Sequence, residues 1–329
     1  MRPNRKPGPE KETGPAEMIG PAGVLEPANL IGADRAATLR EDAGPRGIAR
    51  PGEAVGPARA RRQPWLPAGV RAAAFGCLLF ALAAVETPRP AAAWTPNTQV
   101  TIAEEAARLA PPDLARQIKK RQAAFEAGVV GPFEDVDPER HRKYADGNGR
   151  LDAVLLAEVA GAVTAIRSHQ PFDEIVRRMG AVAHYVADAN NPLASSGEDP
   201  EAGRYFVDYL RYAESALPRF PLIFYGVQPG LEDERGVSSL IGEALRRGRE
   251  LYPLVGQEYR KIDFGSGVAE FDDRSTAFAV ASVSFSHAVT DVALVLRYIW
   301  IRAGGADDRT GLPAAGSRLL LLPRASLSR

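Results

Sequence analysis

Two His-x-x-x-Asp pairs stand out among the residues whose types could do chemistry. His184 and Asp188 form the first pair, and His287 and Asp291 form the second. On an α-helix, residues four apart lie one turn apart on the same face. An imidazole and a carboxylate can then turn towards one cation, and both are ligands that Zn²⁺ takes in proteins. Each pair therefore predicts part of a metal site, provided that it lies on a helix.

Both pairs also have a purely structural interpretation. The first pair lies on the side of its predicted helix opposite to the apolar stripe, so it could belong to a solvated polar face. The stripe consists of Ile175, Met179, Val182 and Val186. The second pair lies in the most apolar segment of the chain, where a histidine bonded to its own aspartate would need no metal.

Apolar residues recur at helical spacing through most of the chain after residue 93, and almost no segment alternates as a strand does. Helices are predicted over residues 98–109, 112–127, 152–167, 172–190, 201–217, 238–249, 250–262 and 275–302. The last of these is apolar nearly all round, which predicts a central buried helix. Residues 218–236 are expected to form a loop, and Asp146 to Gly149 a turn. The predicted fold is all-α, with a single multi-helix domain.

The tripeptide Ala91-Ala92-Ala93 precedes Trp94 and has the form of a signal-peptidase site. Upstream lie an arginine-rich stretch, an uncharged run over residues 72–85 and a polar segment over residues 86–90. Residues 59–93 therefore read as a secretory signal, with a retained amphipathic or anchor segment as the alternative. Trp94 would become the first residue of an exported protein, periplasmic or extracellular, and its free amine could bind a metal.

Composition suggests how the rest of the chain is organised. Residues 1–58 are rich in Pro, Gly, Ala and Arg, which predicts a disordered or spurious extension, with translation beginning later. Residues 94–302 form the predicted domain, and residues 303–329 a loose tail. The only cysteine, Cys77, lies in the uncharged run, so the exported part would have no thiol. Lys and Arg together number 41, as do Asp and Glu, so no global field favours nucleic acid or an anionic membrane.

Three parts of the sequence together resemble the zinc-dependent phospholipase C and fungal single-strand nuclease family. They are Trp94 after its cleavage site, His141, and the run from His184 through Asp188 to Pro192-Leu193. The resemblance covers about residues 94–210. It implies an all-α fold, zinc as the cofactor, and a phosphoester substrate, either a phospholipid or a single-stranded nucleic acid. In that family the terminal tryptophan, histidines and carboxylates together hold three zinc ions.

Carried over residue by residue, the resemblance implies one complete metal site. His141, His184 and Asp188 match its ligands, and Asp135 or Asp137 would supply the preceding carboxylate. If the protein is active, Asp135 or Asp137 would orient the attacking water on that metal, and Asp135 is the residue that we name as catalytic.

The other two metal sites of the family are incomplete in this chain. Trp94 matches the amino-terminal ligand, but Gln99 stands where the first helix should offer a histidine. Ala194 and Arg204 replace the histidines of the third site, which leaves Asp208 as its remaining ligand. The distant pair His287 and Asp291 could take over that role, although the family offers no counterpart.

These matches and losses support more than one function. The first is an exported zinc-binding hydrolase of the phosphodiesterase type, with one complete metal site. The alternative is a non-catalytic helical binding or structural module that keeps the family fold, in effect a pseudoenzyme. A third interpretation is an unrelated exported helical protein.

Overall fold

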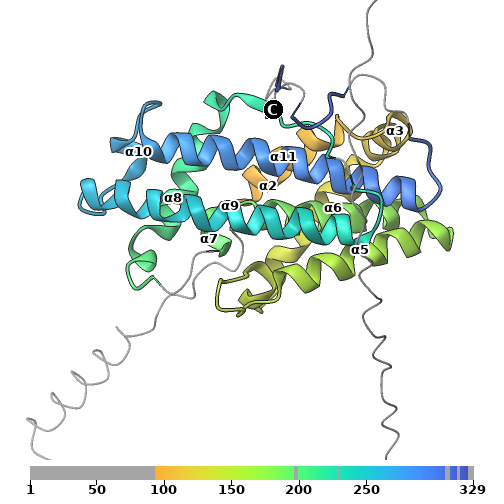
Figure 1. The fold of residues 1–329 in the computed structure, drawn as a ribbon, viewed down its shortest axis with the longest axis horizontal. Coiled ribbons are helices and arrows are strands. Elements are labelled where there is room, and N and C mark those ends of the chain that lie inside the picture. Colours follow the sequence, from red (N-terminus) through yellow and green to blue (C-terminus); the bar gives the residue numbers. More distant parts are fainter. Residues whose placement is uncertain (1–92, 196–198, 229, 308–311, 317–318, 325–329) are drawn as a thin grey trace, which may run out of the picture. The chain divides into compact units, whose positions relative to one another are not determined.

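Helices account for almost all of the regular structure in the computed structural model (Figure 1), which describes residues 93–195, 199–228, 230–307, 312–316 and 319–324. The predicted extension over residues 1–58 and the predicted signal up to residue 92 lie outside the described residues. The α-helices are α2 (Pro96–Ala107), α3 (Pro112–Lys120), α4 (Gln122–Val130), α5 (Leu151–Arg167), α6 (Phe172–Ala189), α7 (Pro192–Ser195), α8 (Ala202–Ala216), α9 (Glu234–Lys261), α10 (Gly267–Glu270) and α11 (Thr276–Arg302). The 3-10 helices are η1 (Gly131–Glu134), η2 (Pro138–His141) and η3 (Leu217–Arg219). The predicted all-α class is confirmed.

The starts of α2 and α11 follow the local capping chemistry. The Thr95 side chain accepts a hydrogen bond from the backbone N–H of Thr98 at 3.3 Å, and Pro96 occupies the first turn of α2. Ser275 caps α11 in the same way by accepting from the backbone N–H of Phe278 at 3.1 Å. A hydroxyl at this position satisfies a donor that the helix itself leaves without a partner.

The apolar helix α11 is the central element of the fold, as its composition predicts. It packs against α2, α5, α6, α9 and the first strand, and in Figure 1 it runs beside α9. By length and composition α11 is, among the described residues, the one helix that could cross a membrane, but 83% of its apolar window is buried inside the protein. That burial is what a core helix of this composition shows.

The region predicted as two helices, 238–249 and 250–262, is a single 28-residue helix, α9, with Pro253 inside it. Proline in a helix interior removes one hydrogen bond and strains the preceding turn. Here the apolar face is buried on both sides of that point, at Leu245 and at Val255. Tertiary packing therefore keeps the helix continuous where the local signal predicts a break.

A two-stranded antiparallel sheet joins β1 (Leu222–Phe224) to β2 (Leu320–Leu322), with Ile223 opposite Leu321. The sequence predicts a loop for the first segment and a loose tail for the second. The N–H groups of Ile223 and Tyr225 donate to the hydroxyls of Ser286 and Thr290 on α11, each at 3.2 Å. Strands of three residues carry no readable periodicity, and their partners lie far away in sequence.

Candidate metal centre

His141, His184 and Asp188 meet in the interior, and the side chains of all three are 0% exposed. His184 and Asp188 lie on the last turns of α6, and His141 ends η2. The interpretation of the first pair as a solvated polar face is therefore wrong. Every residue from Val182 to Ala189 is buried, because α4, α5, α11 and α2 cover α6 on several sides.

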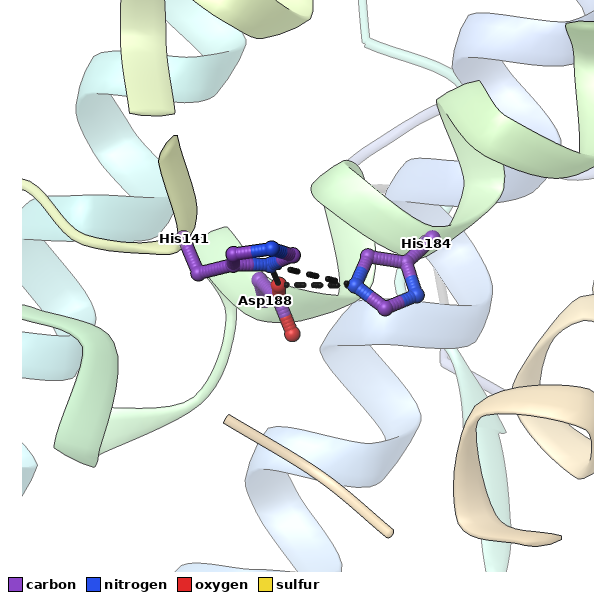
Figure 2. A group of neighbouring side chains, drawn as sticks. All are labelled: His141, His184 and Asp188. Carbon is purple, nitrogen blue, oxygen red and sulfur yellow. Dashed lines mark hydrogen bonds and ion pairs between the residues drawn. The ribbon is translucent and has the colours of Figure 1, made fainter. Parts of the chain in front are cut away.

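One oxygen of Asp188 lies between the two imidazoles (Figure 2). Asp188 Oδ2 is 2.7 Å from His141 Nδ1 and 3.1 Å from His184 Nε2, and the two nitrogens are 3.2 Å apart. On its other side, His184 Nδ1 contacts the carbonyl oxygen of Val129 at 2.8 Å. A carbonyl can only accept, so Nδ1 carries a hydrogen, and Nε2 is the ring nitrogen that faces Asp188 and His141.

These three ligand atoms fit the coordination of a zinc ion. Tetrahedral zinc with ligands at 2.0–2.1 Å holds them about 3.3 Å from one another, close to the separations observed. A carbonyl bonded to the far nitrogen of a ligating histidine is the usual outer contact of such a site. Two buried polar atoms beside the group, His141 Nε2 and Gln99 Oε1, have no hydrogen-bond partner among the residues that the structure describes. Two imidazoles and a carboxylate form a donor set that suits Zn²⁺.

The Asp188 carboxylate is held in its ionised form. Burial by itself raises the pKa of Asp188, but the His184 charge and the hydrogen bonds of both imidazoles outweigh it, so the pKa falls to about 2. The second oxygen, Oδ1, accepts from Gln99 Nε2 at 2.7 Å and from the backbone N–H of Ala93 at 3.2 Å. Gln99, which stands where the family places a ligand, is thus bonded to the central carboxylate.

Trp94 lies against the same group. Its ring is 1% exposed, and the indole N–H donates to the carbonyl of Ala187 at 2.9 Å. The side-chain amide of Asn191 donates a hydrogen bond to the carbonyl of Ala93. The backbone at the predicted cleavage junction is therefore next to Asp188, where the resemblance would place an amino-terminal ligand.

The structure gives the predicted aspartates outside α6 other partners. Asp135 forms an ion pair with Arg140, and Asp137 forms one with Arg150. Asp208 accepts hydrogen bonds from the Tyr259 hydroxyl and the Gly267 N–H, both at 2.7 Å. Within the described part of the chain, the ligand group contains only His141, His184 and Asp188.

Two aromatic residues near the imidazoles were not among the predicted site residues. The Tyr185 ring lies with its centroid 5.3 Å from each imidazole centroid, and Phe133 meets His184 edge-on at 4.9 Å. Tyr185 follows His184 directly in sequence, which is the one signal that could have pointed to it. Phe133 and the Val129 carbonyl reach the site only through the packing of η1 and α4 on α6.

The second His-x-x-x-Asp pair is split by contacts from other elements. The His287 ring stacks on Tyr225, with centroids 3.8 Å apart and the planes at 4°. Asp291 accepts from Arg247 of α9 at 2.6 Å, and Arg247 also donates to Asn190 at 3.1 Å. The expected bond between His287 and Asp291 is therefore wrong. The pair also lies outside the ligand group, and the ion-pair partner of its carboxylate is Arg247.

Asp291 should make stability depend on pH. Burial raises its pKa from 3.8 to about 6, against the opposing charge of Arg247. Between these values the folded protein binds more protons than the unfolded chain, so the free energy of unfolding should fall as pH rises from about 4 to 6. This shift in the pKa of Asp291 corresponds to a change of about 3 kcal/mol in the free energy of unfolding. Asp291→Asn mimics the protonated form, so urea unfolding at pH 4 and pH 7 should show the variant gaining stability relative to the parent by about that amount. A stability difference between Asp291→Asn and the parent that is the same at pH 4 and at pH 7 would contradict this prediction.

No protein-family model matches the chain, and no curated protein does. Among solved structures, the chain is similar to the alpha toxin from Clostridium absonum, with 15% identity, 68% of each chain covered and a TM-score of 0.46. It is also similar to the Clostridium perfringens alpha-toxin isolated from avian strain SWCP, with 11% identity, 68% of this chain and 67% of that chain covered, and a TM-score of 0.42. At these identities both similarities are likenesses of fold alone.

Proposed function

We propose that this protein binds one zinc ion through His141, His184 and Asp188 and acts as an exported hydrolase of phosphoesters. The observation that carries the proposal is the convergence of three buried ligand atoms within 3.2 Å of one another. Zinc bound there would supply an acidified water and a Lewis acid for a phosphoryl oxygen. The resemblance of Trp94, His141 and the His184 segment to zinc phospholipases C agrees with this chemistry.

Different residues of this chain would have different roles around the metal. The Val129 carbonyl keeps the His184 proton on Nδ1, away from the ligand atom. Asp188 supplies the negative charge that offsets the cation. Asp135 would act as the base proposed for the attacking water. It is now paired with Arg140, whose guanidinium also donates to the Tyr185 hydroxyl at 3.1 Å, so Asp135 must leave this ion pair to act.

A phospholipid is the proposed substrate. Binding to a nucleic acid draws most of its affinity from clustered cations that neutralise phosphates. The formal net charge of this chain is zero, and Arg140, the cation beside the metal centre, is already paired with Asp135. A lipid headgroup carries a single phosphodiester and needs less positive charge.

A non-catalytic zinc module is the second candidate, and one observation favours it. All three ligand side chains are 0% exposed, which is typical of closed structural zinc sites, whereas catalytic sites keep an open position.

Metal analysis and activity assays separate the two candidates. The exported form is purified, its amino terminus, expected at Trp94, is sequenced, and bound zinc is measured by elemental analysis. We expect about one zinc per chain, and hydrolysis of phosphatidylcholine that stops on chelation and returns with zinc. One zinc without hydrolysis of either phosphatidylcholine or single-stranded DNA would select the non-catalytic module. Cleavage of the DNA alone would overturn the proposal that the substrate is a phospholipid. Absence of zinc would overturn both candidate functions.

A further inference from the structure

A cavity of about 390 Å³ opens on the side of α9 that faces the segment after His141. The segment from Lys143 to Gly147, the first turns of α5 and the middle of α9 form its walls. Leu156, Ile241 and Leu245 provide the apolar part of the lining, and Lys143, Asp152 and Arg249 the charged part. Cavities of this size hold small organic molecules.

Arg249 is the unusual residue of this cavity. Its side chain is half-buried, and it has no hydrogen bond, ion pair or ring contact with any residue that the structure describes. Its neighbours on α9 differ: Arg246 is bonded to Glu243 and Glu250, and Arg247 to Asp291. A guanidinium that has lost part of its water needs an anion to replace it.

The other charges in the cavity are already neutralised. Lys143 Nζ lies 3.2 Å from the Asp152 carboxylate and donates to the carbonyls of Gly147 and Gly149 at 3.0 and 3.2 Å. Arg249 is thus the one uncompensated charge among the described residues of the lining. This favours a ligand with a single anionic group.

The wall beside Arg249 is open at Gly242. This glycine lies inside α9, and a Cβ built on it meets no heavy atom within 4 Å. Glycine weakens a helix relative to alanine, and no neighbour in the described structure requires it here. The absence of a side chain instead leaves room for a ligand to approach the helix.

We propose that this cavity binds a small organic oxyanion, with its phosphate or carboxylate on Arg249 and its apolar body against Leu156 and Leu245. The fork of the guanidinium matches the oxygens of either group in two parallel hydrogen bonds. This site uses none of the zinc ligands, so it stands independently of the proposed hydrolase function.

Calorimetric titration of the full chain tests the proposal with four probes: inorganic phosphate, glycerol 3-phosphate, butyl phosphate and butyrate. We expect saturable binding of at least one organic probe at millimolar concentration. Tighter binding of the phosphates than of butyrate would identify the anionic group as phosphate, and the reverse as carboxylate. Arg249→Gln should weaken binding at least about tenfold. The matched control, Arg246→Gln, removes the same charge from the same helix and should leave the affinity within about twofold.

A second variant tests the position of the site. Gly242→Leu fills the open wall and should abolish binding, while circular dichroism and zinc content stay at their parental values. The proposal is overturned if no organic probe binds the parent protein, if Arg246→Gln weakens binding as much as Arg249→Gln does, or if a folded Gly242→Leu protein binds normally. Because zinc content is measured in parallel, a failure here is distinguishable from a failure of the zinc centre.

Discussion

Replacing His184 with alanine is expected to abolish zinc binding and to destabilise the protein. The substitution removes one of three ligands and leaves the Val129 carbonyl without its donor inside the core. Losing an outer contact alone lowers metal affinity by 10- to 100-fold in comparable sites, so loss of a ligand should cost at least about 100-fold. The orphaned carbonyl and the cavity together should lower the free energy of unfolding by about 3 kcal/mol.

Elemental analysis and chemical unfolding with and without a chelator measure both effects of His184→Ala. The parent protein should become less stable when zinc is removed, because a metal that binds the folded state stabilises it. The variant should show no such response. His169→Ala is the control, since His169 is exposed and lies outside the ligand group, and it should keep zinc and stability. A His184→Ala protein with parental zinc content would contradict the proposed role of His184 as a zinc ligand.

Trp94→Ala is expected to cause the largest loss of stability that a single truncation can produce in this part of the core. The ring is 1% exposed and its N–H is bonded to Ala187, one residue before the central carboxylate. Truncation of a buried tryptophan costs about 3–5 kcal/mol. Because the indole N–H is bonded to the residue next to Asp188, loosening this contact should also weaken zinc binding.

Urea unfolding of two further variants separates packing from hydrogen bonding at Trp94. Trp94→Phe keeps an aromatic ring but removes the indole N–H, while the Ala187 carbonyl still accepts from the Asn190 N–H, so the loss should be about 0.5–1.5 kcal/mol. Trp300→Ala is the matched truncation, because Trp300 is only half-buried and its indole nitrogen has no hydrogen-bond partner within the described part of the chain. A Trp94→Ala protein that loses no more stability than Trp300→Ala would show that Trp94 does not anchor the segment.

Much of the helical architecture could be predicted from the sequence because its signals are local. The apolar period of 3.6 residues, the Ser275 cap and the prolines mark helices whose observed ends mostly differ little from those expected. The exception is the helix predicted over residues 112–127, which is divided into α3 and α4. The same local rule places His184 and Asp188 one turn apart on α6. At α9 local rules fail, because the two helices predicted over residues 238–249 and 250–262 are one helix, whose apolar face is buried on both sides of Pro253.

Local sequence signals do not predict how the metal centre assembles, because its residues are far apart in sequence. His141 and Asp188 are 47 residues apart, and Gln99 and Asp188 are 89 apart. No periodicity records such contacts, so His141 could be named only through the resemblance, and the Val129 carbonyl could not be named at all. The same limit explains why the equally spaced pair His287 and Asp291 does not form a site, since Arg247 from α9 takes the carboxylate.

Local sequence specifies the helices and the one-turn spacing of two ligands, because these depend on residues within a few positions of one another. Contacts between helices select which His-x-x-x-Asp pair receives a second histidine and which receives an arginine. The same contacts bury the face that carries His184. Burial and charge pairing depend on neighbours that other helices supply, and the sequence of one helix does not specify those neighbours.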